Sequence, residues 1–214
     1  VQYHQHACHL EDGWLDHAGG GPTRRPSPGG WHDAGDYNKY VVNAGVSVGL
    51  ILKALEHFPE RISAVKLDIP ESANRVPDLL DEVRWELDWL FTMQLEDGRV
   101  YHKLSSLDFR YWGPADADKG PRYFAPWSTA ATAHFTAMMA CAARHFRPHD
   151  EAFAERCLKA AELSWKCLRE HPKQIDPDQS AFKTGGYIAP DASARLWAAA
   201  GLWETTGRAV YLRE

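Results

Sequence analysis

The sequence has 214 residues, of which 44% are hydrophobic and 25% are charged, and its formal net charge is −5 at pH 7. This composition is typical of a globular protein and excludes a disordered chain, which would contain fewer large apolar residues. The acidic balance and the scattered Lys and Arg residues argue against a nucleic-acid partner. No apolar run is long enough to span a bilayer, so no membrane partner is expected.

The first part of the chain, residues 1–38, is predicted to be a loop. Residues 19–22 and 26–30 contain too many glycines and prolines for a regular helix or strand. Order in this segment is therefore expected to come from contacts with the rest of the protein or from a bound metal.

Two helices are predicted in the next part of the chain. Residues 39–58 carry apolar side chains at helical spacing, and Pro59 is expected to end this helix. The second helix is predicted over residues 77–94, with Pro77 in its first turn. Residues 100–104 fit a short extended piece. The polar face of the second helix is predicted to consist of Asp78, Asp81, Glu82, Arg84 and Glu86.

Three further helices are predicted over residues 128–145, 150–170 and 191–206, the first two with Ser and Asp as N-caps. Gly207 ends the third, and residues 208–214 look like the opening of a sixth. The sequence contains no convincing run of strands, so the predicted fold class is all-α. Its long, uneven loops suit a helical toroid in which one end collects the loops into a cleft.

Residues 29–40, Gly-Gly-Trp-His-Asp-Ala-Gly-Asp-Tyr-Asn-Lys-Tyr, carry the clearest chemistry. Only Ala and Gly separate Asp33 from Asp36, so the backbone can turn tightly and bring both carboxylates toward one point. Two carboxylates facing one water can hold and deprotonate it, as an inverting glycosidase requires. Trp31 and Tyr37 are candidates for sugar contacts. The alternative is that both aspartates only cap turns or the following helix.

Other polar residues also form candidate sites. Cys8, His9 and His32 are candidate zinc ligands, because thiolate and imidazole groups bind zinc well; the alternative is a buried Cys with two loop His residues. Asp116 and Asp118, in a proline-rich loop, can line a cleft but are expected to be solvated.

Several stretches, in order along the chain, resemble glycoside hydrolase family 9, a family of cellulases. Residues 29–40 match its N-terminal catalytic signature almost completely. The similarity is greatest to the cellulase-D or cellodextrinase branch. Further matching stretches are residues 41–45, 77–82, 100–103, 121–123 and 128–133.

This resemblance implies an (α/α)6 barrel, with residues 1–214 as about the first half of a single catalytic domain. It implies inverting hydrolysis of β-1,4-glucan (cellulose, cellodextrins or mixed-linkage glucan), with Asp36 as general base and Asp33 positioning the water. His102 and Lys103 resemble a pair in this branch, which makes His102 a candidate substrate contact; the alternative is an ordinary surface strand. The general acid, a Glu, is expected downstream, so the isolated chain is predicted to be inactive without the C-terminal half of the barrel as its partner.

The resembled branch also carries a structural zinc, bound by an upstream Cys, a Cys-His pair and the His before the aspartate motif. Cys8, His9 and His32 occupy the last three of these positions. The upstream Cys is absent, and His4, His6 or a water are the expected substitutes.

Many relatives bind calcium through a Thr/Ser-Gly-x-Tyr segment and a following pair of acids. Residues 184–187 match that segment, but Ser193, Ala194 and Arg195 lie where the acids are expected. Asp191 is the only nearby carboxylate, whereas calcium prefers six to eight oxygen ligands. The sequence therefore predicts that this calcium site is weakened or lost.

Two alternatives to a glucanase remain open at this point. An exo-β-glucosaminidase acting on chito-oligosaccharides could use the same fold and acid–base chemistry. A non-catalytic carbohydrate-binding helical domain would bind sugar without cleaving it. A polymeric substrate favours a secreted or periplasmic protein, whereas short cellodextrins would also permit the cytoplasm.

Overall fold

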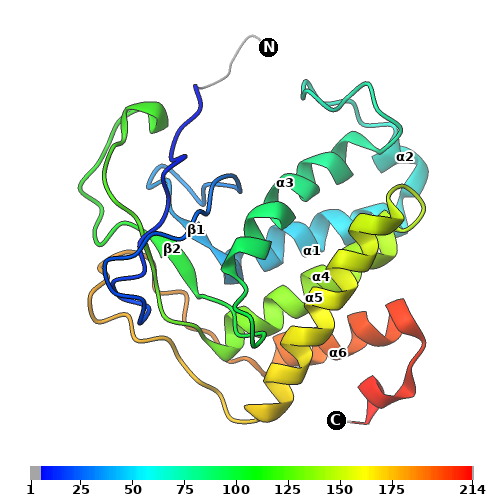
Figure 1. Ribbon diagram of the computed structural model, residues 1–214. Coiled ribbons are helices and arrows are strands. Elements are labelled where there is room, and N and C mark those ends of the chain that lie inside the picture. Colours follow the sequence, from blue (N-terminus) through cyan, green and yellow to red (C-terminus); the bar gives the residue numbers. More distant parts are fainter. Residues whose placement is uncertain (1–5, 214) are drawn as a thin grey trace.

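The computed structural model describes residues 6–213 as a packed group of helices, with loops and a small sheet gathered at one end (Figure 1). The helices are α1 (Val41–His57), α2 (Pro59–Ser63), α3 (Asp78–Met93), α4 (Thr129–Phe146), α5 (Glu151–Glu170) and α6 (Ala192–Thr206). The strands are β1 (Lys39–Tyr40), β2 (Lys103–Ser105) and β3 (Tyr123–Phe124), and two 3₁₀ turns cover Ala115–Ala117 and Ala209–Leu212.

Helix α4 forms the centre of the helical group. Almost all of its side chains are buried, and it packs against α1, α5 and α6. Its many alanines allow these neighbours to approach closely. The predicted N-caps are confirmed, because Ser128 Oγ accepts a hydrogen bond from Ala131 N (3.0 Å) and Asp150 Oδ1 accepts one from Phe153 N (2.9 Å).

The helix ends differ slightly from the sequence predictions. Pro59 follows α1 as expected, but it also begins α2, because proline is tolerated at the first helical position. Gly207 ends α6 in the left-handed conformation, as predicted. Beyond it, residues 209–212 form a 3₁₀ turn rather than the opening of a further α-helix.

A small antiparallel sheet has the order β1-β2-β3. Its middle strand overlaps the extended piece predicted over residues 100–104, whereas β1 and β3 are additions to the predicted helical pattern. Lys39 pairs with Leu104, and Leu104 pairs with Phe124. The strands contain two or three residues each, which is too short for an alternating hydrophobic pattern to show. The sheet joins the start of α1 to the loops on either side of it.

Three residues on the predicted polar face of α3 are not exposed to solvent, because Asp78, Asp81 and Glu86 are buried. The loops around α3 cover this face and supply hydrogen-bond donors. Leu67 N donates to Asp78 Oδ2 (2.8 Å), and Asn74 Nδ2 donates to Asp81 Oδ2 (2.9 Å). These acids are therefore anchors for loops, a role that helical periodicity does not reveal.

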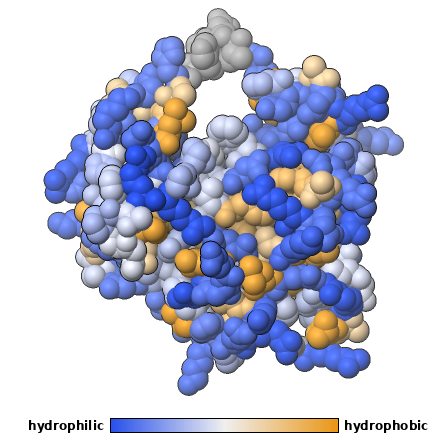
Figure 2. All heavy atoms as spheres, in the orientation of Figure 1, coloured by the Kyte–Doolittle hydropathy of each residue, from blue (hydrophilic) through white to orange (hydrophobic). Residues whose placement is uncertain are grey.

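The surface is mostly polar, with apolar patches between the charged side chains (Figure 2). Some exposed apolar residues lie on helices: Val46 and Leu50 of α1 are 60% and 67% exposed, and Leu196 of α6 is 72% exposed. Within residues 6–213, no helix combines the length and apolar character needed to cross a membrane.

Candidate active site and metal centre

The loop before β1 holds the two candidate catalytic aspartates. Gly30 has a φ of +77°, and a Cβ there would lie 2.6 Å from Trp89 Cγ, so the turn requires glycine. Trp31 N donates to Glu86 Oε2 (2.5 Å), and Asp33 N donates to Asn38 O (2.9 Å). The loop is therefore tied to α3 at one end and closed on itself at the other.

A group of buried charges lies beneath this loop. Lys39 Nζ donates to Ser27 O (3.0 Å) and Gly29 O (2.9 Å), and it lies 3.5 Å from Asp12 Oδ2. Arg122 Nε donates to both carboxylate oxygens of Asp12, at 3.1 and 2.9 Å. Buried charges of this kind are tolerated only when they are paired and hydrogen-bonded, as they are here.

Asp36 is half-buried, and several donors fix its carboxylate. Tyr40 Oη donates to Oδ2 (2.9 Å), as does Asn38 Nδ2 (3.1 Å), while Asn38 N donates to Oδ1 (3.2 Å). Burial and the nearby Asp36 carboxylate raise the pKa of Tyr40, which keeps its hydroxyl a donor. The buried ammonium of Lys103 also interacts electrostatically with Asp36.

Asp33 is more exposed and has a partner far away in sequence. Its Oδ1 accepts from Asn43 Nδ2 (2.6 Å), and its Oδ2 accepts from Tyr187 Oη (2.9 Å), 154 positions along the chain. The rings of Tyr187 and Tyr40 meet edge to face, with centroids 4.7 Å apart. Tyr187 therefore connects Asp33 to Tyr40, the donor to Asp36, and sequence patterns gave no sign of this contact.

The two aspartates line different pockets. Asp36 opens onto a cavity of about 310 Å³ that also includes Phe109 and Tyr111. Asp33 lines another of about 270 Å³, together with Trp31. The structure thus joins the aspartates through a tyrosine pair, and their convergence on one water stays a prediction.

Two of the predicted sugar contacts have structural partners. Trp31 Nε1 donates to Glu82 Oε1 (2.7 Å), which leaves the ring at the pocket of Asp33. The Tyr37 hydroxyl donates to Gly113 O, and the ring lies 5.1 Å from that of His32. Sugar binding by both residues stays a prediction.

The third predicted contact, His102, is only 1% exposed. Its Nε2 lies 2.8 Å from Gly186 O and must donate to it, so Nδ1 accepts from Ser128 Oγ (2.8 Å). Burial lowers the pKa of His102 to about 4, in agreement with this neutral form. In the structure His102 holds the loop that carries Tyr187, and a direct sugar contact stays a prediction.

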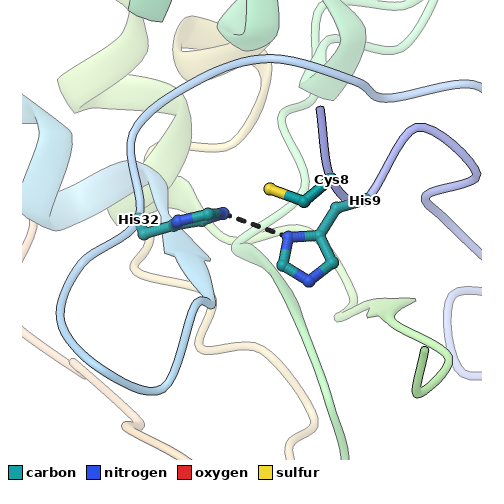
Figure 3. A group of neighbouring side chains, drawn as sticks. All are labelled: Cys8, His9 and His32. Atoms are coloured by element: carbon teal, nitrogen blue, oxygen red, sulfur yellow. Dashed lines mark hydrogen bonds between the residues drawn. The ribbon is translucent and has the colours of Figure 1, made fainter. Parts of the chain in front are cut away.

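The metal-ligand candidates Cys8, His9 and His32 come together beside this site (Figure 3). One ligand atom from each lies within 4.8 Å of the others, and His9 Nδ1 is 3.2 Å from His32 Nε2. Burial lowers the pKa of His32 and so favours the neutral imidazole that binds metals. Tyr37 packs against both imidazoles, so the cluster supports the residue next to Asp36.

These donors fit a zinc ion held by three protein ligands. Thiolate and imidazole are the preferred zinc donors, and a fourth position would remain for another group. The cluster borders a cavity of about 590 Å³, which gives an ion access from the surface. His4 lies outside the described residues, and the cluster found among residues 6–213 does not include His6.

The segment that corresponds to the relatives' calcium site contains two side-chain cations of the protein itself, Lys103 and Arg195. Lys103 Nζ donates to Thr184 Oγ1 (3.1 Å) and Gly185 O (2.8 Å), and burial lowers its pKa to about 8. Arg195 donates to Asp191 Oδ2 (2.9 Å) and to two carbonyl oxygens at the end of α5. The oxygen ligands that calcium needs are therefore already paired, and this segment does not fit the ion.

Comparison with known proteins matches residues 1–214 to the family described as glycosyl hydrolase family 9. "Endoglucanase D" of Acetivibrio thermocellus is 48% identical over 217 residues, which cover 100% of this chain and 35% of that protein. A solved metagenome-derived glycoside hydrolase family 9 endoglucanase superposes with a TM-score of 0.88 at 44% identity, over 96% of this chain and 38% of that one. A Zn-binding triple mutant of the family 9 endoglucanase J30 superposes with a TM-score of 0.83 at 33% identity, over 95% and 40% of the two chains.

These matches bear out the predicted resemblance and fold class. The solved relatives are (α/α)6 barrels, and this chain corresponds to their helices over about two fifths of their length. The chain likewise spans about a third of the curated endoglucanase that it matches.

Proposed function

The chain belongs to glycosyl hydrolase family 9, and we propose that the protein containing it hydrolyses β-1,4-glucan by an inverting mechanism. The observation that carries this proposal is the Asp33–Tyr187–Tyr40–Asp36 connection at the loop end of the helices. It holds two carboxylates in fixed orientations beside cavities, which a pair of turn-capping residues would not require. The similar proteins are endoglucanases, which favours a glucan over an amino sugar as the substrate.

In this proposal Asp36 is the general base. Its carboxylate accepts hydrogen bonds from Tyr40 and Asn38 and interacts electrostatically with the buried ammonium of Lys103. Asp33, held by Asn43 and Tyr187, orients the attacking water. The base activates water on the face of the sugar opposite the leaving group, which produces inversion.

Aromatic side chains offer surfaces for the sugar near Asp36. Phe109 and Tyr111 line its cavity, and Trp112 in the same loop is 80% exposed. The apolar face of a pyranose stacks on rings of this kind, and Trp112 is therefore a candidate platform in addition to Trp31 and Tyr37. His102 takes part indirectly, through its bond to the loop of Tyr187.

The general acid, a Glu, is proposed to lie outside this chain, in the C-terminal half of the same catalytic domain. An inverting site needs an acid and a base on opposite sides of the scissile bond, so we expect the isolated chain to be inactive. The exposed apolar residues of α1 and α6, Val46, Leu50 and Leu196, fit a surface that the rest of the barrel covers. A polymeric glucan as substrate implies a secreted or periplasmic protein.

We also propose that Cys8, His9 and His32 hold a structural zinc ion. When bound, zinc would contribute stability by joining the N-terminal loop to the loop of the catalytic aspartates. The ion would act on the fold and on the position of Tyr37, and it takes no part in the chemical step.

The direct test is to incubate the complete natural protein with β-1,4-gluco-oligosaccharides and, separately, with chito-oligosaccharides. We expect cleavage of the gluco-series, and NMR of the first product should show the α-anomer, because inversion changes the configuration of a β-linkage. Cleavage of the chito-series alone would replace the glucanase proposal with the glucosaminidase. Binding without cleavage of either series would replace it with a carbohydrate-binding domain.

A further inference from the structure

His9 has a second ring nitrogen, which points away from His32 (Figure 3). Its Nδ1 faces the cluster, 3.2 Å from His32 Nε2, while its Nε2 is buried and has no hydrogen-bond partner among the described residues. The nearest charged group is Asp118 Oδ2, 3.4 Å from Nε2. The His9 side chain is 4% exposed and that of Asp118 is 12% exposed, so water screens this pair only weakly.

We propose that Asp118 is the outer partner of the metal centre, accepting a hydrogen bond from His9 Nε2 and so directing Nδ1 toward the ion. This inference rests on the proposed zinc site. A metal-bound histidine commonly donates its other N–H to a carboxylate, which fixes its tautomer and the orientation of its ring. A ring approach of roughly 0.5 Å would bring the pair to the usual N–H···O distance of about 2.9 Å.

Asp118 does not belong to the cluster of direct ligand candidates, because its carboxylate lies on the other side of the His9 ring. Its second oxygen is already used: Oδ1 accepts from Gly120 N (2.9 Å) and shapes the turn at residues 118–120. One carboxylate thus holds its own loop with one oxygen and faces the metal centre with the other. Its position in a proline-rich loop predicts only a solvated acid, so sequence patterns do not reveal this role.

The position of Asp118 also connects the metal centre to the cavity of Asp36. Asp118 lines the 590 Å³ cavity together with Cys8 and His9, and it lines the 310 Å³ cavity together with Asp36. Its loop therefore forms a wall between the two. Binding of an ion would hold this wall through His9, and so would restrict the aromatic side of the proposed sugar site.

The test compares the complete protein with its Asp118→Asn and Asp116→Asn variants. Asn keeps the acceptor for Gly120 N but removes the charge facing His9, whereas Asp116 lies in the same loop and no contact between it and His9 is found among the described residues. Zinc affinity is measured by competition with a chromogenic chelator. We expect Asp118→Asn to lose about 10- to 100-fold in affinity, the usual range for such partners, and Asp116→Asn to match the parent.

A second measurement distinguishes a change in the orientation of His9 from a general loss of folded structure. With Co²⁺ in place of zinc, the thiolate-to-cobalt and ligand-field absorption bands should change in Asp118→Asn and stay as in the parent in Asp116→Asn. Zinc should also slow hydrogen exchange of residues 115–121 in the parent but much less in Asp118→Asn. Equal affinity and equal spectra in the parent and Asp118→Asn would overturn the inference, and a parent that binds no zinc would overturn it together with the zinc site, leaving the hydrolase proposal intact.

Discussion

Two parts of this chain correspond to metal sites of the resembled family. They differ in whether side-chain cations already bond the candidate ligand atoms. At Cys8, His9 and His32, three ligand atoms converge. The cations that act on this cluster, Lys39 and Arg122, are both paired with Asp12. At residues 184–195, Lys103 and Arg195 already bond the oxygens that would otherwise face calcium. We infer that a loop can be held in place either by a bound metal ion or by a buried side-chain cation. A loop held by a side-chain cation does not need the ion.

The largest expected effect comes from adding each ion to the metal-free protein. Zinc should raise the free energy of unfolding by about 4 kcal/mol when its free concentration is about 1,000 times its Kd, because it binds only the folded site. Calcium at the same concentration should leave the melting temperature unchanged. Melting curves of the complete protein with either ion test this prediction. Equal stabilisation by calcium and by zinc would show that the two sites do not differ in metal binding.

The Arg195→Ala variant tests whether the Arg195 cation stabilises the segment of residues 184–195. The substitution removes the side-chain donor to Asp191, which is 6% exposed, and to the carbonyl of His171, while Leu168 O keeps its bond from His171 N. We expect a loss of about 2–4 kcal/mol in the free energy of unfolding, measured in urea, which is the range for an uncompensated buried charge together with an unpaired carbonyl.

Lys166→Ala is the matched control, because Lys166 pairs with Glu170 in solvent at the end of the same α5. Exposed pairs of this kind contribute little, so this variant should unfold within about 0.5 kcal/mol of the parent. Equal losses in the two variants would mean that Arg195 does not fasten the loop.

The loop of Tyr187 should also respond to pH through His102. The pKa of this side chain is about 4 in the folded protein and about 6.5 when unfolded, so between these values the unfolded state binds more protons. Stability from this group is complete above pH 6.5 and declines by about 3 kcal/mol as the pH falls to 4. Urea unfolding of the parent and His102→Gln across this range should show the smaller slope in the variant, and parallel curves would contradict the assignment.

The smallest expected effect concerns the contact between Tyr187 and Asp33. Tyr187→Phe removes one hydrogen bond to the carboxylate that orients the water, and it keeps the ring against Tyr40. We expect kcat to fall about tenfold, or about 1.4 kcal/mol, with little change in KM. Tyr211→Phe, which removes a bond between the last 3₁₀ turn and Glu162 of α5, should leave both constants unchanged. A similar fall of kcat in both variants would mean that the loss in Tyr187→Phe does not come from its bond to Asp33.

The helical part of this fold could be predicted from local sequence signals. Ser128 and Asp150 cap the helices where expected, and Gly207 ends α6, because caps depend on a few neighbouring residues. The aspartate motif and the Cys8–His9–His32 cluster were also visible, since their residues are chemically distinctive.

The contacts that hold the site could not be predicted in the same way. Tyr187 reaches Asp33 across 154 positions, and Lys103 reaches Thr184 across 81. Glu86 was predicted only as part of a polar helix face, but a loop 55 residues earlier covers it and burial raises its pKa to about 8. Such pairs depend on how loops from different helices meet, which hydrophobic periodicity does not record.

The central claim is that Asp36 is the general base of a β-glucan hydrolase, and hydrolysis by Asp36→Asn measures it most directly. Asn keeps the size of the side chain but not its ability to take a proton. We predict that kcat of the complete protein on β-1,4-gluco-oligosaccharides falls by about 10²–10⁴-fold, with oligosaccharide binding and the melting temperature retained. A variant that keeps kcat within a few-fold of the parent would contradict the account.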